Sequence, residues 1–236
     1  MILYVNGDSH TAAAEAVNPH AFAMDDPALF YQGRYPHPEN LAVSWGRRLS
    51  EAMRASFHCG AESGSSNARI MRTTREFLKK IKNFSELLVV IQWSTWEREE
   101  WLIDGVYHQV GASGTDDVPE SAQQRYKEFV VDSDWRAKTQ AAHEEIWQLH
   151  TELKEQGIKH IFFNGNNDFS SIAAGDRKDW GVSYMDPYES EGTYNARIRA
   201  AGIQTVLPES WHFGKDGHAF WNRHMLKYII ANQIIN

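Results

Sequence analysis

Ile2-Leu3-Tyr4-Val5 opens the chain as a short apolar run, and Gly7-Asp8-Ser9-His10 follows it almost at once. A run of this length that ends at a glycine turn is typical of a buried strand. We therefore expect Ser9 to lie on a tight turn at the rim of a sheet, where α/β folds usually bind their ligands. A Gly-Asp-Ser turn is common by chance, so Ser9 indicates a site only together with a partner residue.

Apolar segments of strand type alternate with segments of helical periodicity along the whole chain. This alternation favours a parallel sheet with helices on both faces. We expect a three-layer α/β/α sandwich with a mostly parallel five-stranded sheet, built as a single domain over residues 1–236 with rim loop insertions near 12–39 and 101–133. The predicted strands are 2–5, 55–59, 87–91, 160–163 and 203–207, and the predicted helices are 40–54, 68–81, 134–156 and 219–235.

The composition excludes several classes of protein. Hydrophobic residues make up 42% of the 236 residues, which excludes wholesale disorder. The net charge of -7, without a basic stripe, argues against nucleic acid as a partner. The sequence shows neither a signal peptide nor an apolar stretch of membrane-spanning length, so we expect a cytoplasmic protein without a membrane partner.

The metal-ligating residue types also point away from a cofactor. Cys59 is the only cysteine, which excludes an intramolecular disulfide and argues against a thiolate zinc site. The 11 histidines show no ligand spacing. We therefore expect neither a metal nor another cofactor.

A candidate partner for Ser9 lies in Glu209-Ser210-Trp211-His212, directly after the last predicted strand. Strands of a parallel sheet end at the same rim, so His212 can approach Ser9 there. A histidine base activates a serine nucleophile, and a carboxylate holds the histidine in the required tautomer. Glu209 is three residues from His212, which would bring the two side chains to one side of a turn. Asp216 and His218 form a second possible pair, although their spacing of two is less suited to orienting an imidazole.

The combination of these blocks resembles the SGNH (GDSL-type) hydrolase family. That family has a three-layer α/β fold, a Gly-Asp-Ser block after the first strand, and a last block Asp-x-x-His that is often followed by Gly-His and a closing helix. Glu209 here stands in place of the Asp, and Gly217-His218 matches the family's Gly-His pair. The resemblance implies Ser9 as the nucleophile, His212 as the base and Glu209 as the residue that orients the base.

The family's second block is similar to Ser63-Gly64-Ser65-Ser66-Asn67, which implies that the Gly64 N–H faces the oxyanion together with the Ser9 N–H. The third block, Gly-x-Asn-Asp, is substituted, because Trp96 stands where the family has its oxyanion-binding Asn. The chain thus resembles a divergent member of the family. Asn67 is our first candidate for a replacement donor, and Asn167 in Gly165-Asn166-Asn167-Asp168 is the alternative.

We therefore predict a serine esterase or deacylase that forms an acyl-enzyme on Ser9. The expected substrate is a small-molecule or glycan ester, with a short acyl group such as acetyl on a carbohydrate as the preferred form. The aromatic side chains expected to bind it are Trp93, Trp96 and Trp211. The alternative, motivated by the substituted third block, is a catalytically weak or inactive SGNH-fold protein with a binding or structural role.

Overall fold

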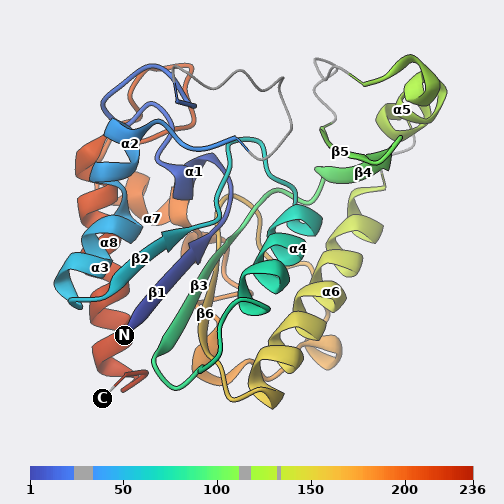
Figure 1. The fold of residues 1–236 in the computed structure, drawn as a ribbon. Coiled ribbons are helices and arrows are strands. Elements are labelled where there is room, and N and C mark those ends of the chain that lie inside the picture. Colours follow the sequence, from blue (N-terminus) through green and yellow to red (C-terminus); the bar gives the residue numbers. More distant parts are fainter. Residues whose placement is uncertain (24–33, 112–117, 132–133, 236) are drawn as a thin grey trace.

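The fold is centred on a parallel sheet of four strands in the order β2-β1-β3-β6 (Figure 1). The computed structural model describes residues 1–23, 34–111, 118–131 and 134–235. All seven residues of β3 are buried, as expected for a central strand covered on both faces. The strands are β1 (Ile2–Asn6), β2 (Ser56–Cys59), β3 (Leu87–Trp93) and β6 (Lys159–Asn164).

Helices cover both faces of this sheet (Figure 1). Because successive strand residues point to opposite faces, Leu87, Val89 and Ile91 pack in one apolar cluster and Leu88 and Val90 in another. The first cluster is completed by α4 (Asn67–Leu78) and α6 (Trp135–Glu155), and the second by α3 (Trp45–Ala52), α7 (Tyr194–Ala200) and α8 (Lys215–Ala231). The predicted three-layer α/β architecture is therefore present.

Local capping explains where these helices begin and end. The side chain of Asp134 caps the start of α6, and Gly157 follows its end with a φ of 68°. The helix predicted over 40–54 is two helices, α2 (Pro38–Val43) and α3. Ser44 separates them, because its extended backbone leaves the helix while its hydroxyl accepts from the Arg47 N–H and caps α3.

The fifth predicted strand is wrong, because residues 203–207 do not join the sheet. Only Thr205 of this segment forms a bridge, an isolated antiparallel one with Phe213. The free edge of β6 pairs with another segment: Tyr184 bridges Phe162, and the Met185 N–H donates to the Phe162 carbonyl at 2.9 Å. Leu207 is also 54% exposed, so the apolar pattern there does not mark a buried strand.

The region near 101–133, predicted as a rim loop, contains regular structure. An antiparallel hairpin of β4 (Glu99–Ile103) and β5 (Val106–Val110) precedes η1 (Glu120–Ala122) and α5 (Gln123–Val131). These elements share a third apolar cluster around Trp101 and Tyr126. The remaining short helices are α1 (Ser9–Ala12), η2 (Ala174–Asp176), η3 (Gly181–Ser183) and η4 (Ser190–Gly192). Among the described residues, no helix is both long and apolar enough to cross a membrane.

Candidate active site

A cavity of about 650 Å³ lies at the carboxyl-terminal ends of the four parallel strands. Each strand contributes to its lining through the residues that follow it. These include Ser9 and His10 after β1, Ser63 and Gly64 after β2, Thr95 and Arg98 after β3, and Asn166 and Asn167 after β6. The cavity therefore occupies the rim where the sequence predicted a site.

Ser9 is the first residue of the one-turn helix α1, and its turn is tightly packed. A Cβ on Gly7 would lie 2.5 Å from Thr11 Oγ1 and 2.8 Å from Gln92 Oε1, so only glycine fits there. Asp8 caps the helix by accepting from the His10 N–H at 3.0 Å. The short turn thus places Ser9 in the cavity lining with little freedom of backbone movement.

Asp8 is itself buried and is held from the β3 side. Its Oδ2 accepts from Ser94 Oγ at 2.9 Å and from Arg98 Nη1 at 3.3 Å. Burial acts to raise the pKa of the Asp8 carboxyl, but the neighbouring His10 and Arg98 outweigh this effect and lower it. Asp8 therefore stays ionised beneath the nucleophile, where it joins the loop after β1 to the loop after β3.

His212 lines the same cavity, and its partner carboxylate is Glu15. His212 Nδ1 lies 2.8 Å from Glu15 Oε2, and Ser210 Oγ donates to the same oxygen at 2.8 Å. The His212 N–H donates to Ser210 Oγ at 3.0 Å, which closes a small network. Burial acts to raise the pKa of Glu15, but the hydrogen bonds from His212 and Ser210 hold it below its ordinary value.

Glu209, predicted as the orienting carboxylate, does not occupy that position. Its side chain is exposed, and no hydrogen bond or ion pair links it to His212 within the described part of the chain. Glu15 comes from the loop after α1, almost two hundred residues away in sequence. No spacing rule connects Glu15 with His212, so sequence reasoning missed it.

The second acid–histidine pair also fails to form. His218 is 1% exposed, and its Nδ1 accepts from the Trp45 N–H at 3.3 Å. Burial lowers the pKa of His218 to about 3. Asp216 is exposed in the first turn of α8. His218 therefore acts as a neutral packing residue between α8 and the start of α3.

Gly64 lies in the cavity lining at a sharp turn between β2 and α4. The Ser65 N–H donates to the Glu62 carbonyl at 3.1 Å, and Gly64 has a φ of 83° at the third position of the turn. This geometry is that of a type II turn, which favours glycine at that position. The turn brings the backbone of Ser63 and Gly64 to the cavity that Ser9 lines.

The two candidate asparagines have different surroundings. Asn67 is 5% exposed and engaged with the backbone of Ser94, whose N–H donates to Asn67 Oδ1 at 2.8 Å. Asn67 Nδ2 lies 3.4 Å from the Ser94 carbonyl oxygen, so both ends of the amide face that residue. Asn167, in contrast, lines the cavity. The alternative candidate, and not the first one, thus lines the cavity that Ser9 also lines.

The contacts that Asn195 makes with the loop after β6 were not predicted from the sequence. Asn195, on α7, donates from its backbone N–H to the Gly165 carbonyl at 3.1 Å and from its side chain to Asn166 Oδ1. The same Asn195 Nδ2 lies 3.2 Å from His10 Nε2. Burial lowers the pKa of His10 to about 4, so this ring is a neutral acceptor at pH 7. The residue after the nucleophile is thereby tied to the loop after β6.

Two of the three predicted substrate-binding aromatics lie in the core. Trp93 is fully buried against Phe162, and Trp96 stacks on Phe169 with ring centroids 4.9 Å apart. Trp211 is 67% exposed and lines the cavity, as the prediction requires. Trp135, at the start of α6, also lines the cavity and is 48% exposed. The sequence analysis did not single it out, because it lies within a segment predicted as a helix.

Comparisons with solved structures find proteins of the same fold. One match is the structure titled "Crystal Structure of TesA", with 11% identity, a TM-score of 0.52 and complete coverage of both chains. Another is a carbohydrate esterase family 2 enzyme with a carbohydrate-binding domain from Corynascus thermopiles (Myceliophthora fergusii), with 12% identity and a TM-score of 0.51. That match covers 98% of this chain and 66% of the other. At these identities the likeness shows the fold alone, which agrees with the three-layer α/β architecture expected from the sequence.

Comparison with curated protein sequences gives no significant match. Residues 32–163 match the model of a family described as "Family of unknown function (DUF6071)". The matched segment includes β2, β3, the β4–β5 hairpin and the Gly64 turn, and it ends within β6. Because the match covers more than half of the sequence, the chain belongs to the DUF6071 family.

Proposed function

We propose that the protein is a serine hydrolase of carboxylic esters, with Ser9 as nucleophile, His212 as base and Glu15 as the orienting carboxylate. The observation that carries the proposal is the hydrogen bond between His212 Nδ1 and Glu15 at the cavity that Ser9 lines. With Nδ1 engaged by the carboxylate, Nε2 is the nitrogen that can accept a proton from Ser9. This arrangement is the division of roles that a serine triad requires.

The chemistry proceeds through an acyl-enzyme. Ser9 Oγ attacks the ester carbonyl while His212 Nε2 takes its proton, and the carbonyl oxygen becomes an oxyanion. The N–H groups of Ser9 and Gly64 and the amide of Asn167 stabilise that charge. Collapse breaks the ester C–O bond, and the alcohol leaves with the proton from His212. A water molecule, deprotonated by His212, then attacks the acyl carbonyl and releases the acid from Ser9.

The preferred substrate is a small or glycan ester with a short acyl group such as acetyl. Two aromatic rings, Trp135 and Trp211, line the cavity and remain partly exposed, so they can stack on a sugar ring. Asn166 and Arg98 supply polar groups in the same lining. A volume of about 650 Å³ is within the range of small-molecule sites.

The direct test is covalent labelling by a phosphonate or sulfonyl fluoride, mapped by mass spectrometry, together with hydrolysis of p-nitrophenyl acetate. We expect the adduct on Ser9, and we expect Ser9→Ala to abolish both labelling and hydrolysis while the fold is retained. Ser170→Ala, on an exposed turn outside the cavity, is the matched control and should behave as wild type. Labelling of another residue, or equal hydrolysis by Ser9→Ala, would refute the proposal.

The second candidate is a non-catalytic SGNH-like protein that binds its ligand in the same cavity. Trp96 favours it, because this buried, stacked side chain replaces the oxyanion-binding Asn of the family pattern. Loss of one oxyanion donor costs roughly 100- to 1000-fold in rate. Two results together would select this candidate. The protein would hydrolyse neither short acyl esters nor acetylated glycans, and it would bind a glycan saturably, with weaker binding in Trp211→Ala.

A further inference from the structure

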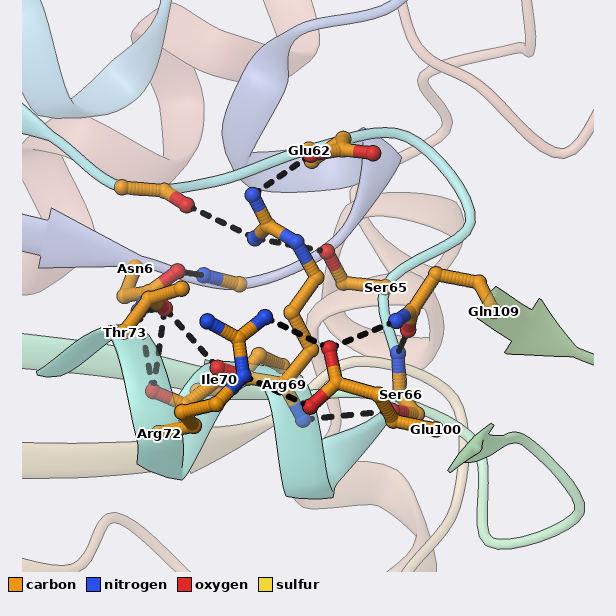
Figure 2. A network of polar contacts seen from close by, with 12 residues as sticks. Asn6, Glu62, Ser65, Ser66, Arg69, Ile70, Arg72, Thr73, Glu100 and Gln109 are labelled. Atoms are coloured by element: carbon orange, nitrogen blue, oxygen red, sulfur yellow. Dashed lines mark hydrogen bonds and ion pairs between the residues drawn. The ribbon is translucent and has the colours of Figure 1, made fainter. Parts of the chain in front are cut away.

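Arg69, in the first turn of α4, contacts the Gly64 turn at Glu62 and Ser65 and the chain just before it at Gly60 (Figure 2). It is 7% exposed, and its Nη1 donates to the Gly60 carbonyl at 3.0 Å and to Ser65 Oγ at 3.2 Å. Its Nη2 forms an ion pair with Glu62 at 2.5 Å. A planar guanidinium with several fixed donors is suited to holding several groups in one geometry. Arg69 therefore ties both sides of the turn to α4.

Gln109 of β5 contacts the other end of the same turn (Figure 2). This side chain is 2% exposed, and its Oε1 accepts from the Ser66 N–H at 2.8 Å. Ser66 is the N-cap of α4, where backbone N–H groups need partners from outside the helix. Gln109 Nε2 donates to Glu100 Oε1 at 2.9 Å. The hairpin thus satisfies a buried backbone donor two residues after Gly64.

The hairpin is in turn docked on α4 by Glu100 and Arg72. Arg72 binds the Glu100 carboxylate in a bidentate manner, with nitrogen–oxygen distances of 2.8 and 2.6 Å. Arg72 also lies over the Tyr107 ring, 4.0 Å from its centroid. Neither Arg72 contact involves the turn itself. Arg72 Nη2 and Gln109 Nε2 donate to the same oxygen, Glu100 Oε1, so Glu100 joins the docking ion pair to the side chain that supports the turn.

We propose that Gln109 and Arg69 are positioning residues that fix the Gly64 N–H for the oxyanion, so that the β4–β5 hairpin is a working part of the active site. This inference rests on the proposed function for its catalytic consequence. The Gly64 turn is anchored at Glu62, Ser65 and Ser66, on both sides of the glycine. Oxyanion stabilisation depends on donors that are already in place when charge develops, so loss of an anchor weakens transition-state binding more than substrate binding.

Gln109→Leu is the sharpest variant, because it removes the acceptor for the Ser66 N–H with little change in volume. Arg69 variants would leave Glu62 as an unpaired buried charge and are prone to misfold. We expect Gln109→Leu to lower kcat by about 10- to 100-fold, since small misplacements in an active site have effects of this order. KM for p-nitrophenyl acetate should change less than about twofold, and phosphonate labelling of Ser9 should slow in proportion to kcat.

Two further variants separate positioning from plain stabilisation. Arg72→Met removes the docking ion pair and leaves the Gln109 Oε1 bond to the Ser66 N–H in place, so it should lower Tm and lower kcat less than Gln109→Leu does. Gln109→Glu alone would set two carboxylates against each other, so it is combined with Glu100→Gln, which restores a donor to that contact. The double variant keeps an acceptor for the Ser66 N–H, so its kcat should exceed that of Gln109→Leu. If Arg72→Met and Gln109→Leu lose kcat to the same extent at matched loss of Tm, Gln109 is merely structural and the inference is overturned.

Amide hydrogen exchange of peptides that cover residues 62–66 distinguishes failure of this inference from failure of the proposed function. Gln109→Leu should raise exchange there, and Arg72→Met should raise it less. Unchanged exchange in Gln109→Leu overturns the anchoring itself. An inactive wild type overturns the proposed function, and with it the catalytic role of the anchor, while raised exchange in Gln109→Leu would still establish that Gln109 holds the turn.

Discussion

Single residues decide how His212, the proposed base, is oriented. His212 and Glu15 are brought together by a hydrogen bond between two rim loops, with Ser210 donating to the same carboxylate. The acidic residue close to His212 in sequence, Glu209, is exposed instead. Residue identity alone therefore pointed to a histidine that lines the cavity and to a carboxylate that does not contact it.

Glu15→Gln tests this assignment at the residue scale. Because the amide cannot stabilise the imidazolium that forms on His212, we expect kcat for p-nitrophenyl acetate to fall on the order of 100- to 10,000-fold. Glu209→Gln, the matched control, should retain wild-type kcat. The kinetic constants are measured at pH 7 to 8 with folding checked by circular dichroism. A large loss in Glu209→Gln with an active Glu15→Gln would reverse the assignment.

At the scale of elements, we propose that the loop after β6 supplies the oxyanion donor that the family pattern places in the loop after β3. The residues after β3 place Trp96 in the core against Phe169. The loop after β6 carries Asn166 and Asn167 to the cavity, and Asn195 from α7 holds it there. Adjacent parallel strands end at one rim, so either loop can reach the same reaction centre.

Asn167→Ala tests whether this loop supplies an oxyanion donor. We expect kcat to fall roughly 100- to 1000-fold with little change in KM, because the interaction forms only in the transition state. Asn67→Ala is the control that shares the amide chemistry. It should lower Tm through loss of its bonds to the Ser94 backbone, with a smaller effect on kcat. The opposite ranking of the two kcat values would return the donor role to Asn67.

For the whole molecule, three buried histidines make stability depend on pH. Burial lowers the pKa of His10 and His160 to about 4 and that of His218 to about 3. In the unfolded chain these rings titrate near about 6.5, so below that pH the unfolded state binds more protons than the folded state. Stability is therefore expected to be full above pH 7 and to fall as pH drops from about 6.5 toward 4.

Urea unfolding between pH 7.5 and 5 measures this effect above the ordinary pKa values of Asp and Glu. The midpoint should decrease steadily on acidification. His218→Asn keeps an acceptor for the Trp45 N–H and removes one titrating ring, so its midpoint should depend less on pH. His20→Asn, which replaces an exposed histidine, is the control and should show the wild-type slope. A wild-type midpoint that is constant over this range would contradict the prediction.

Periodicity along the chain was sufficient to predict four of the strands and most of the helices. Runs such as Leu87–Trp93 are apolar and buried on both faces. Helices such as α6 are flanked by residues that favour helix ends, here Asp134 before and Gly157 after. The segment 203–207 had the same apolar character, but Tyr184 and Met185 occupy the β6 edge in its place. Competition for a sheet edge depends on the packed structure and has no local signature.

His212 lines the cavity at the predicted rim although the strand predicted before it is absent, so a local pattern does not account for its place there. The sequence by itself determined the α/β class and the rim position of Ser9 and Gly64. These features follow from local patterns, because strand ends and turns are specified by neighbouring residues. Only the tertiary structure decided that Glu15 contacts His212, that Asn167 rather than Asn67 lines the cavity, and that Gln109 supports the Gly64 turn. Each of these contacts joins segments far apart in the chain, and such contacts are selected by packing of the whole fold.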